Sequence, residues 1–184
     1  ALRDFERRHP GSVYANDVRF SLGSYYCAVG NMPLAREAFE RTEYKALSAP
    51  RREQYDIRMG YVEFTQGDYA AAYDRFSRIG SRSEYADHAL YYRSYIDYAE
   101  GRYDRAKDGF TQLTRSDAYR DLVPFYLLQI EFRNGNYRYV VDHGEELVRK
   151  AVPERQAELE RVIAESWFRL DNYNAAIEHM DRYT

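Results

Sequence analysis

Several features that define common protein classes are scarce or absent in this 184-residue sequence. The single cysteine, Cys27, excludes an intramolecular disulfide and any metal site built from several thiolates. No apolar run approaches the roughly 20 residues that a membrane-spanning helix needs, so we expect no such span. Acidic residues outnumber basic ones by 30 to 27, for a formal charge of −3. Because no excess of positive charge attracts phosphates, we expect no nucleic-acid partner.

Constellations that carry chemistry are also lacking. The four histidines, His9, His88, His143 and His179, lie in separate segments. Three of them follow an acidic residue directly, but adjacent residues on a helix point apart and do not form a dyad. The sequence has no His-x-x-x-His pair and no glycine-rich phosphate loop. We therefore expect no enzyme activity, no bound metal and no cofactor.

What the sequence has in abundance is tyrosine, at 20 residues, together with a repeated turn signal. The signal is a glycine followed by a polar residue and, in most copies, an aromatic one. It begins at Gly30, Gly67, Gly101 and Gly135, and at Asp171 with aspartate in place of glycine. The five positions are separated by 37, 34, 34 and 36 residues. A recurring period near 34 indicates internal repeats.

Each turn signal lies between two segments with helical periodicity. Upstream, apolar residues recur at helical spacing, as in Tyr91, Tyr95 and Tyr98; downstream, an alanine and an aromatic residue stand four apart, as in Ala72 and Phe76. Glycine after the last helical residue adopts the left-handed conformation at little cost, and a polar residue then opens the second helix. We expect Ser12, Ser83 and Ser116 to cap the helices that follow them, and Pro50 and Pro153 to lie near helix starts.

These spacings resemble the tetratricopeptide repeat, with its Leu-Gly-x-x-Tyr, Gly-x-Tyr and Ala-x-x-x-Phe pattern. The matching residues are Leu22, Gly23, Tyr26, Gly30, Met32, Ala35 and Phe39 in the first copy; Met59, Gly60, Gly67, Tyr69, Ala72 and Phe76 in the second; Ser94, Gly101, Tyr103, Ala106 and Phe110 in the third; and Ala164, Trp167, Tyr173, Ala176 and Met180 in the fifth. The resemblance implies an all-α fold, an αα-hairpin solenoid of about five repeats wound into a right-handed superhelix.

The repeat boundaries follow from this register. We expect one solenoid over 1–184, with repeats at 11–48, 49–82, 83–116, 117–153 and 154–184, and 1–10 as the tail of a preceding repeat. Both ends then look cut, so we expect a fragment of a longer repeat protein. The fourth copy departs most, because Val140 and Gly144 replace the small alanine and the aromatic residue. Either Trp167 fills the space left at Gly144, or that helix is locally loose.

In this architecture the first helices line a concave groove. Helical spacing places twelve mostly aromatic residues there: Phe20, Ile57, Tyr61, Phe64, His88 near the rim, Tyr91, Tyr95, Tyr98, Phe125, Gln129, Phe132 and Phe168. Tyrosine offers a large contact area, little side-chain entropy to lose and a polar tip, which suits protein recognition. The alternative is that these rings fill the space between adjacent helices.

The sequence therefore predicts a non-catalytic scaffold that binds a protein or peptide partner in this groove. The alternative function is a glycan- or peptidoglycan-binding solenoid whose rings stack on sugars. End-to-end self-association through the two ends is a further possibility. HPGSVYANDVRFSLGSYYCAVGN, at 9–31, resembles linkers in bacterial cell-envelope tetratricopeptide proteins such as BamD and CpoB, and 122–137 is similar to long Bacteroidetes repeat proteins. That resemblance implies a periplasmic or outer-membrane-associated location, with the cytoplasm left open.

Overall fold

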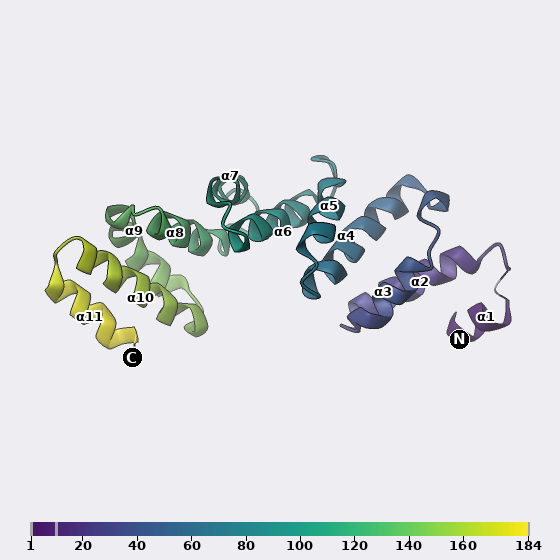
Figure 1. Cartoon of the computed structure of the whole chain (residues 1–184), viewed down its shortest axis with the longest axis horizontal. Coiled ribbons are helices and arrows are strands. Elements are labelled where there is room, and N and C mark those ends of the chain that lie inside the picture. The colour runs from purple at the N-terminus through teal and green to yellow at the C-terminus, as the bar shows by residue number, and fades with distance from the viewer. Residues whose placement is uncertain (1, 10, 184) are drawn as a thin grey trace. The chain divides into compact units, whose positions relative to one another are not determined.

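The computed structural model describes residues 2–9 and 11–183. Within that part of the chain the regular structure is entirely helical, with eleven α-helices, one short 3₁₀ helix and no strand (Figure 1). The chain divides into two compact units, one ending at Ile96 and one beginning at Asp97, inside the sixth helix. Residues 1, 10 and 184, which belong to the first and last predicted ranges, lie outside the described residues.

Each of the five predicted ranges holds one pair of helices. The pairs are α2 (Ala15–Ala28) with α3 (Met32–Glu40), α4 (Ala49–Thr65) with α5 (Tyr69–Ser77), α6 (Ala86–Ala99) with α7 (Tyr103–Leu113), α8 (Val123–Arg133) with α9 (Tyr137–Lys150), and α10 (Pro153–Arg169) with α11 (Tyr173–Tyr183). Helix α1 (Leu2–Arg8) precedes them, and the 3₁₀ helix η1 (Tyr44–Ala46) lies between α3 and α4. The last pair begins one residue before the predicted boundary. The two longer repeat spacings contain α4 and α10, the two 17-residue first helices.

The same turn closes all five first helices. The second residue after each of these helices has positive φ, between 76° and 79° at Gly30, Gly67, Gly101 and Gly135 and 60° at Asp171. Its N–H donates to the carbonyl three residues back, and the next N–H donates to the carbonyl five residues back, as in Asp68 to Glu63. This pair of hydrogen bonds is the Schellman motif. The predicted turns are therefore confirmed, including the aspartate that replaces glycine.

Helix starts follow the prediction only in part. Side-chain oxygens of Asn31, Asp68 and Asn172 accept a hydrogen bond from the N–H three residues on and so cap the second helices α3, α5 and α11. Ser12 and Ser83 do not cap α2 and α6 directly. Their hydroxyls accept from the N–H two residues on, in turns that precede those helices, because each helix begins one residue after the N–H that the serine binds. The prolines Pro50 and Pro153 lie in the first turns of α4 and α10, as expected.

Packing inside the first two hairpins depends on a small residue facing a large one sixteen positions later. A Cβ on Gly60 would lie 2.8 Å from Cε1 of Phe76, and a Cβ on Gly23 would lie 2.6 Å from Cδ1 of Phe39. Both phenylalanines are completely buried. Only glycine therefore fits at these two positions on the first helices.

The fourth hairpin inverts this small–large pair. Leu128 occupies the first-helix position and Gly144 the second-helix position. A Cβ on Gly144 would lie 2.6 Å from Cδ1 of Ile163 on α10 and 3.9 Å from a methyl of Leu128. Ile163 thus fills the space beside Gly144. Trp167 does not fill it, and the helix is not left loosely packed there. Trp167, four residues later, packs at the edge of the same core.

Successive hairpins stack because the next first helix covers each buried aromatic residue. In the first unit, the Tyr92 ring on α6 stacks on Phe76 at 5.0 Å, and Tyr55 on α4 meets Phe39 edge-on at 5.2 Å. In the second unit, the Tyr126 ring on α8 stacks on Phe110 at 4.9 Å. Across residues 2–9 and 11–183, no helix is both long enough and apolar enough to cross a bilayer.

Candidate functional site

In the first unit, half-buried side chains from α4 and α6, most of them aromatic, lie side by side. We call this surface the aromatic face; its residues are Ile57, Tyr61, Phe64, Tyr91 and Tyr95. The ring of Phe64 lies 5.4 Å from that of Tyr95, at nearly right angles, and Tyr91 lies 6.4 Å from Tyr95. These helices thus bring five of the twelve predicted groove residues into one surface.

Tyr92 supports this face from beneath, and the sequence reasoning missed it. Its ring lies 4.9 Å from Phe64, 5.3 Å from Tyr91 and 5.7 Å from Tyr61, and it also stacks on Phe76. Burial raises the pKa of Tyr92 to about 12, with the nearby Tyr61 adding to the shift. The hydroxyl is therefore neutral at physiological pH. A signal for Tyr92 was present, because it stands three residues after the small Ala89 and four before Ile96, on the stripe that faces the preceding hairpin.

Phe20 belongs to the core and not to the exposed face. Its side chain is 5% exposed and packs in a buried hydrophobic cluster that includes Phe39 and Tyr55. The guanidinium groups of Arg51 and Arg58, on the next first helix, lie 5.6 Å and 5.9 Å from its ring centre and cover it. The prediction for Phe20 was therefore wrong, because side chains from the next repeat close over it.

Polar groups border the aromatic face. Arg58 donates a hydrogen bond to the Ser24 hydroxyl at 2.7 Å, so one guanidinium is held between α2 and α4. His88, predicted at a rim, is exposed near the start of α6. Cys27 is half-buried, and burial raises the pKa of its thiol although Arg58 opposes the shift. A thiol with a raised pKa is mostly protonated and is a poor nucleophile.

In the second unit the predicted groove residues are less uniform. Tyr98 lies between Tyr103 at 5.9 Å and Tyr126 at 5.6 Å, and Phe132 is half-buried at 5.9 Å from the Tyr137 ring. Phe125 is half-buried with the Arg155 guanidinium 5.1 Å from its ring centre. These three predicted residues keep part of their surface open.

Gln129 is a second correction in this unit. It is 3% exposed, and its amide nitrogen donates to Oε1 of Glu158 at 3.3 Å. Glu158 also accepts a hydrogen bond from Arg161. This bond lowers the pKa of the Glu158 carboxyl, against the opposing effect of burial, and the hydrogen bond from Gln129 adds to the shift. A buried amide that is already paired offers no contact to a ligand. Phe168, by contrast, is 58% exposed and belongs to a different surface, on α10 and α11.

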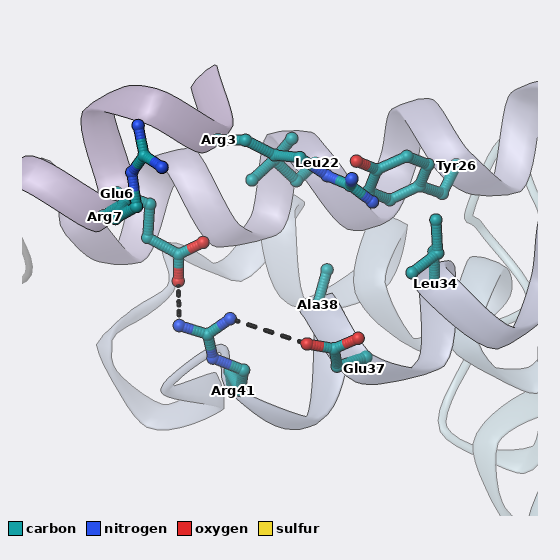
Figure 2. Close-up of a pocket in the computed structure, with 9 residues that line it drawn as sticks. All are labelled: Arg3, Glu6, Arg7, Leu22, Tyr26, Leu34, Glu37, Ala38 and Arg41. Carbon is teal, nitrogen blue, oxygen red and sulfur yellow. Dashed lines mark ion pairs between the residues drawn. The ribbon is translucent and has the colours of Figure 1, made fainter. Parts of the chain in front are cut away.

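A hollow of about 510 Å³ lies between α1, α2 and α3 (Figure 2). Its floor is apolar, with Leu22, Leu34 and Ala38. Its rim is charged: Arg41 pairs with Glu6 at 2.5 Å and with Glu37 at 3.8 Å, as the dashed lines in Figure 2 show. These pairs already satisfy the carboxylates, so the arrangement ties α1 to the first hairpin.

Buried carboxylates elsewhere also have structural partners. Glu131 accepts hydrogen bonds from Asn136 and is paired with Lys107 at 2.5 Å. Although burial opposes it, these hydrogen bonds lower the pKa of Glu131. Glu160 is paired with Nδ1 of the buried His179 at 2.5 Å. Among the described residues, no cluster of three or more His, Cys, Asp or Glu could hold a metal ion.

Comparison with known proteins adds the fold class. No protein-family model matches the sequence, and no curated protein matches it. Solved structures do match. A crystal structure of MamA has a TM-score of 0.72 at 11% identity and covers 94% of this chain and 91% of its own. A structure of MamA from MSR-1 has a TM-score of 0.72 at 13% sequence identity and covers 92% of this chain and 95% of its own.

A second group of structures carries the repeat name. The putative kinesin light chain of Podosopora anserina, a protein with nearly identical TPR-like repeats, has a TM-score of 0.61 at 15% identity, over 90% of this chain and 91% of its own. At such identities the likeness concerns the fold alone. The chain is therefore an all-helical protein with a TPR-like solenoid fold, as the repeat pattern predicted.

Proposed function

We propose that the chain is a non-catalytic protein-interaction scaffold that binds a partner segment on the aromatic face. The observation that carries the proposal is the contact of Phe64, Tyr91 and Tyr95 across two neighbouring first helices, with part of each ring open to solvent. Such rings supply most of the binding energy in many protein interfaces.

The aromatic face is held in place before any partner arrives. Tyr92 is locked between Phe64 and Phe76, so the rings above it have little freedom to lose. Binding to a preorganised surface avoids much of the entropy cost of ordering side chains. A stack of helical hairpins supplies this rigidity, because each hairpin is fixed by its neighbours.

The chemistry of the face selects the kind of partner. Some tetratricopeptide proteins bind the C-terminal carboxylate of a partner with lysine and asparagine side chains on their groove helices. At the comparable positions the aromatic face carries Ile57, Tyr61, Tyr91 and Tyr95. We therefore propose an extended apolar-aromatic peptide, or a helix from a partner subunit. The Arg58 guanidinium at the border suits a carbonyl or acidic group beside the apolar residues.

The experiment is a selection of peptides from a random phage-displayed library on the immobilised chain, followed by calorimetric titration. Tyr61→Ala and Tyr91→Ala should each weaken the selected peptides roughly tenfold or more, as expected for aromatic hot spots. Tyr139→Ala is the matched control, since Tyr139 is 42% exposed on the second helix α9 and should leave affinity unchanged. Equal affinity for all three variants would refute the proposal.

A parallel titration with peptidoglycan fragments tests the glycan alternative. Sugar sites need polar side chains around the stacking ring, and Gln129, one of the few candidates, is buried and paired with Glu158. We therefore favour the protein partner. Saturable binding of muropeptides that Tyr61→Ala removes would reverse that preference.

The cell-envelope location is also a proposal, supported by the resemblance of residues 9–31 to envelope repeat linkers. Fractionation of the native host into cytoplasm, periplasm and membranes, with an antibody against this chain, tests it. Recovery in the cytoplasmic fraction alone would refute it.

A further inference from the structure

A hollow of about 490 Å³ lies within the second unit, where the start of α8, the end of α9 and the start of α10 meet. We call it the inter-hairpin hollow. Its apolar wall is formed by Phe125, Leu147, Ala151, Val152 and Leu159. Val152 is 55% exposed there, so an aliphatic side chain of the wall is open to solvent. The volume is within the range of pockets that bind small molecules, roughly 300–1,000 Å³.

The corresponding place in the first unit carries only apolar and aromatic side chains. Counted from the turns of their hairpins, the positions of Phe125, Leu147, Arg155 and Leu159 correspond to those of Ile57, Ile79, Tyr85 and Ala89. All four side chains of the first unit pack in one hydrophobic cluster. In the second unit three of the four do so, and the fourth, Arg155, takes the place of tyrosine. A cation therefore lines the hollow where the earlier repeat has an aromatic ring.

Arg155 is positioned without being paired. Its guanidinium lies 5.1 Å from the ring centre of Phe125, and its side chain is half-buried. Among residues 2–9 and 11–183, no acidic side chain forms an ion pair with it. A guanidinium presents its N–H groups in a planar fork that matches the two oxygens of a carboxylate. Arg155 can therefore donate two hydrogen bonds to a carboxylate that enters the hollow.

The other charges of the lining favour an anion but limit its charge. Arg120 pairs with Asp117 at 2.9 Å and Lys150 with Glu146 at 2.6 Å, and all four of these side chains are largely exposed. Exposed pairs are weak, so both cations can turn toward an anion. Asp121 is the one acidic residue among the described residues of the lining. Three cations thus attract negative charge, while Asp121 disfavours a second anionic group.

We propose that the inter-hairpin hollow binds a small monocarboxylate with an apolar body. The carboxylate accepts hydrogen bonds from Arg155, and the apolar body lies against Leu147, Ala151 and Val152. A few polar groups that fix one end of a ligand beside an apolar wall are typical of small-molecule sites. The site shares no residue with the aromatic face, so it adds a second binding activity to the scaffold.

The probes are 4-phenylbutyrate, the neutral 4-phenylbutanamide and the cationic 4-phenylbutylamine, each titrated into the 184-residue chain and followed by NMR of isotope-labelled protein. We expect saturable binding of the acid with a Kd below about 1 mM, about tenfold or more tighter than the amide, and no binding of the amine. Arg155→Gln should weaken the acid about tenfold or more and leave the amide unchanged. Val152→Ser should weaken the acid and the amide alike.

Arg149→Gln is the matched control. It removes a charge of the same sign from an exposed side chain next to Lys150, outside the lining of the hollow, and should leave the affinity for the acid unchanged. Circular dichroism of each variant checks that the helices persist.

Four results would overturn the proposal. Equal affinity for the acid and the amide would show that the hollow selects no carboxylate. Unchanged affinity of Arg155→Gln for the acid would remove the assigned contact. An equal loss in Arg149→Gln would indicate diffuse attraction and no built site. Binding of a peptide that ends in phenylalanine about tenfold or more tighter than the acid would assign the hollow to a protein C-terminus.

Discussion

Replacing Gly144 by alanine tests the inverted pair in the fourth hairpin. The added Cβ would lie 2.6 Å from both Cγ1 and Cδ1 of Ile163, well inside the roughly 3.5–4.0 Å of carbon–carbon contact. Ile163 is completely buried and has no open space to enter. Alanine should gain about 1 kcal/mol of helix propensity and lose about 1–3 kcal/mol to overpacking. We expect a net loss of up to about 2 kcal/mol of unfolding free energy from these two terms.

A double-mutant cycle separates the two terms. Ile163→Ala alone should cost about 2–5 kcal/mol, because it leaves a cavity in the core. In that background Gly144→Ala meets no side chain at close range and refills part of the cavity, so it should stabilise by about 1 kcal/mol. The coupling between the two sites should then be about 1–3 kcal/mol, within the range seen for residues in contact.

The assay is urea unfolding followed by circular dichroism and by fluorescence of Trp167, which packs against the same core. Gly80→Ala serves as control, since no neighbouring atom lies within 4 Å of its added Cβ; a change below about 0.5 kcal/mol is expected there. Stabilisation by Gly144→Ala alone, or additivity within about 0.5 kcal/mol in the cycle, would show that Ile163 does not occupy this space.

Three further predictions follow from local geometry and charge, each measured by urea unfolding. Asp171→Gly should stabilise the fold by up to about 1 kcal/mol, because glycine tolerates the positive φ there without strain. Gly135→Ala should destabilise it by about 1–2 kcal/mol through the positive φ alone, since the added Cβ meets no atom. Equal effects of the two substitutions would argue against this turn geometry. The pKa of Glu131 is lowered on folding, so the contribution of this carboxylate to the free energy of unfolding is complete above its ordinary pKa of 4.5 and is lost as the pH falls below it. Glu131→Gln should therefore reduce the difference in unfolding free energy between pH 7 and pH 4. His179→Ala should cost about 3 kcal/mol, since it removes the closest partner of the buried Glu160; a loss below about 1 kcal/mol would contradict this pairing.

The sequence predicted the repeat and its turns well because both are local. A positive φ at Gly30 or Gly135 depends only on the end of one helix, and the same holds for Asp171 in the fifth copy. The alanine–aromatic spacing in α3, α5 and α7 likewise reports one buried stripe on each helix, and Phe39, Phe76 and Phe110 are completely buried. Elements set by neighbours in sequence could therefore be read from sequence.

Contacts between repeats were harder to predict. A first helix carries two apolar stripes, one toward the preceding hairpin and one toward the open face, and they adjoin on the same helix. Spacing alone could not tell that Arg51 and Arg58 would cover Phe20, or that Gln129 would turn inward to Glu158. The occupant of the Gly144 site was also misjudged, because Ile163 and Trp167 stand one turn apart on one helix.

The reversed order of bulk at Leu128 and Gly144 limits how this chain can be recombined. If the second helix of the third hairpin were spliced behind α8, Phe110 would be set against Leu128 in place of glycine. The opposite splice would leave Ser94 facing Gly144, with a void between the helices. The two halves of this hairpin can therefore be exchanged only together, so chimaeras of this chain should be cut between hairpins and not at the turns inside them.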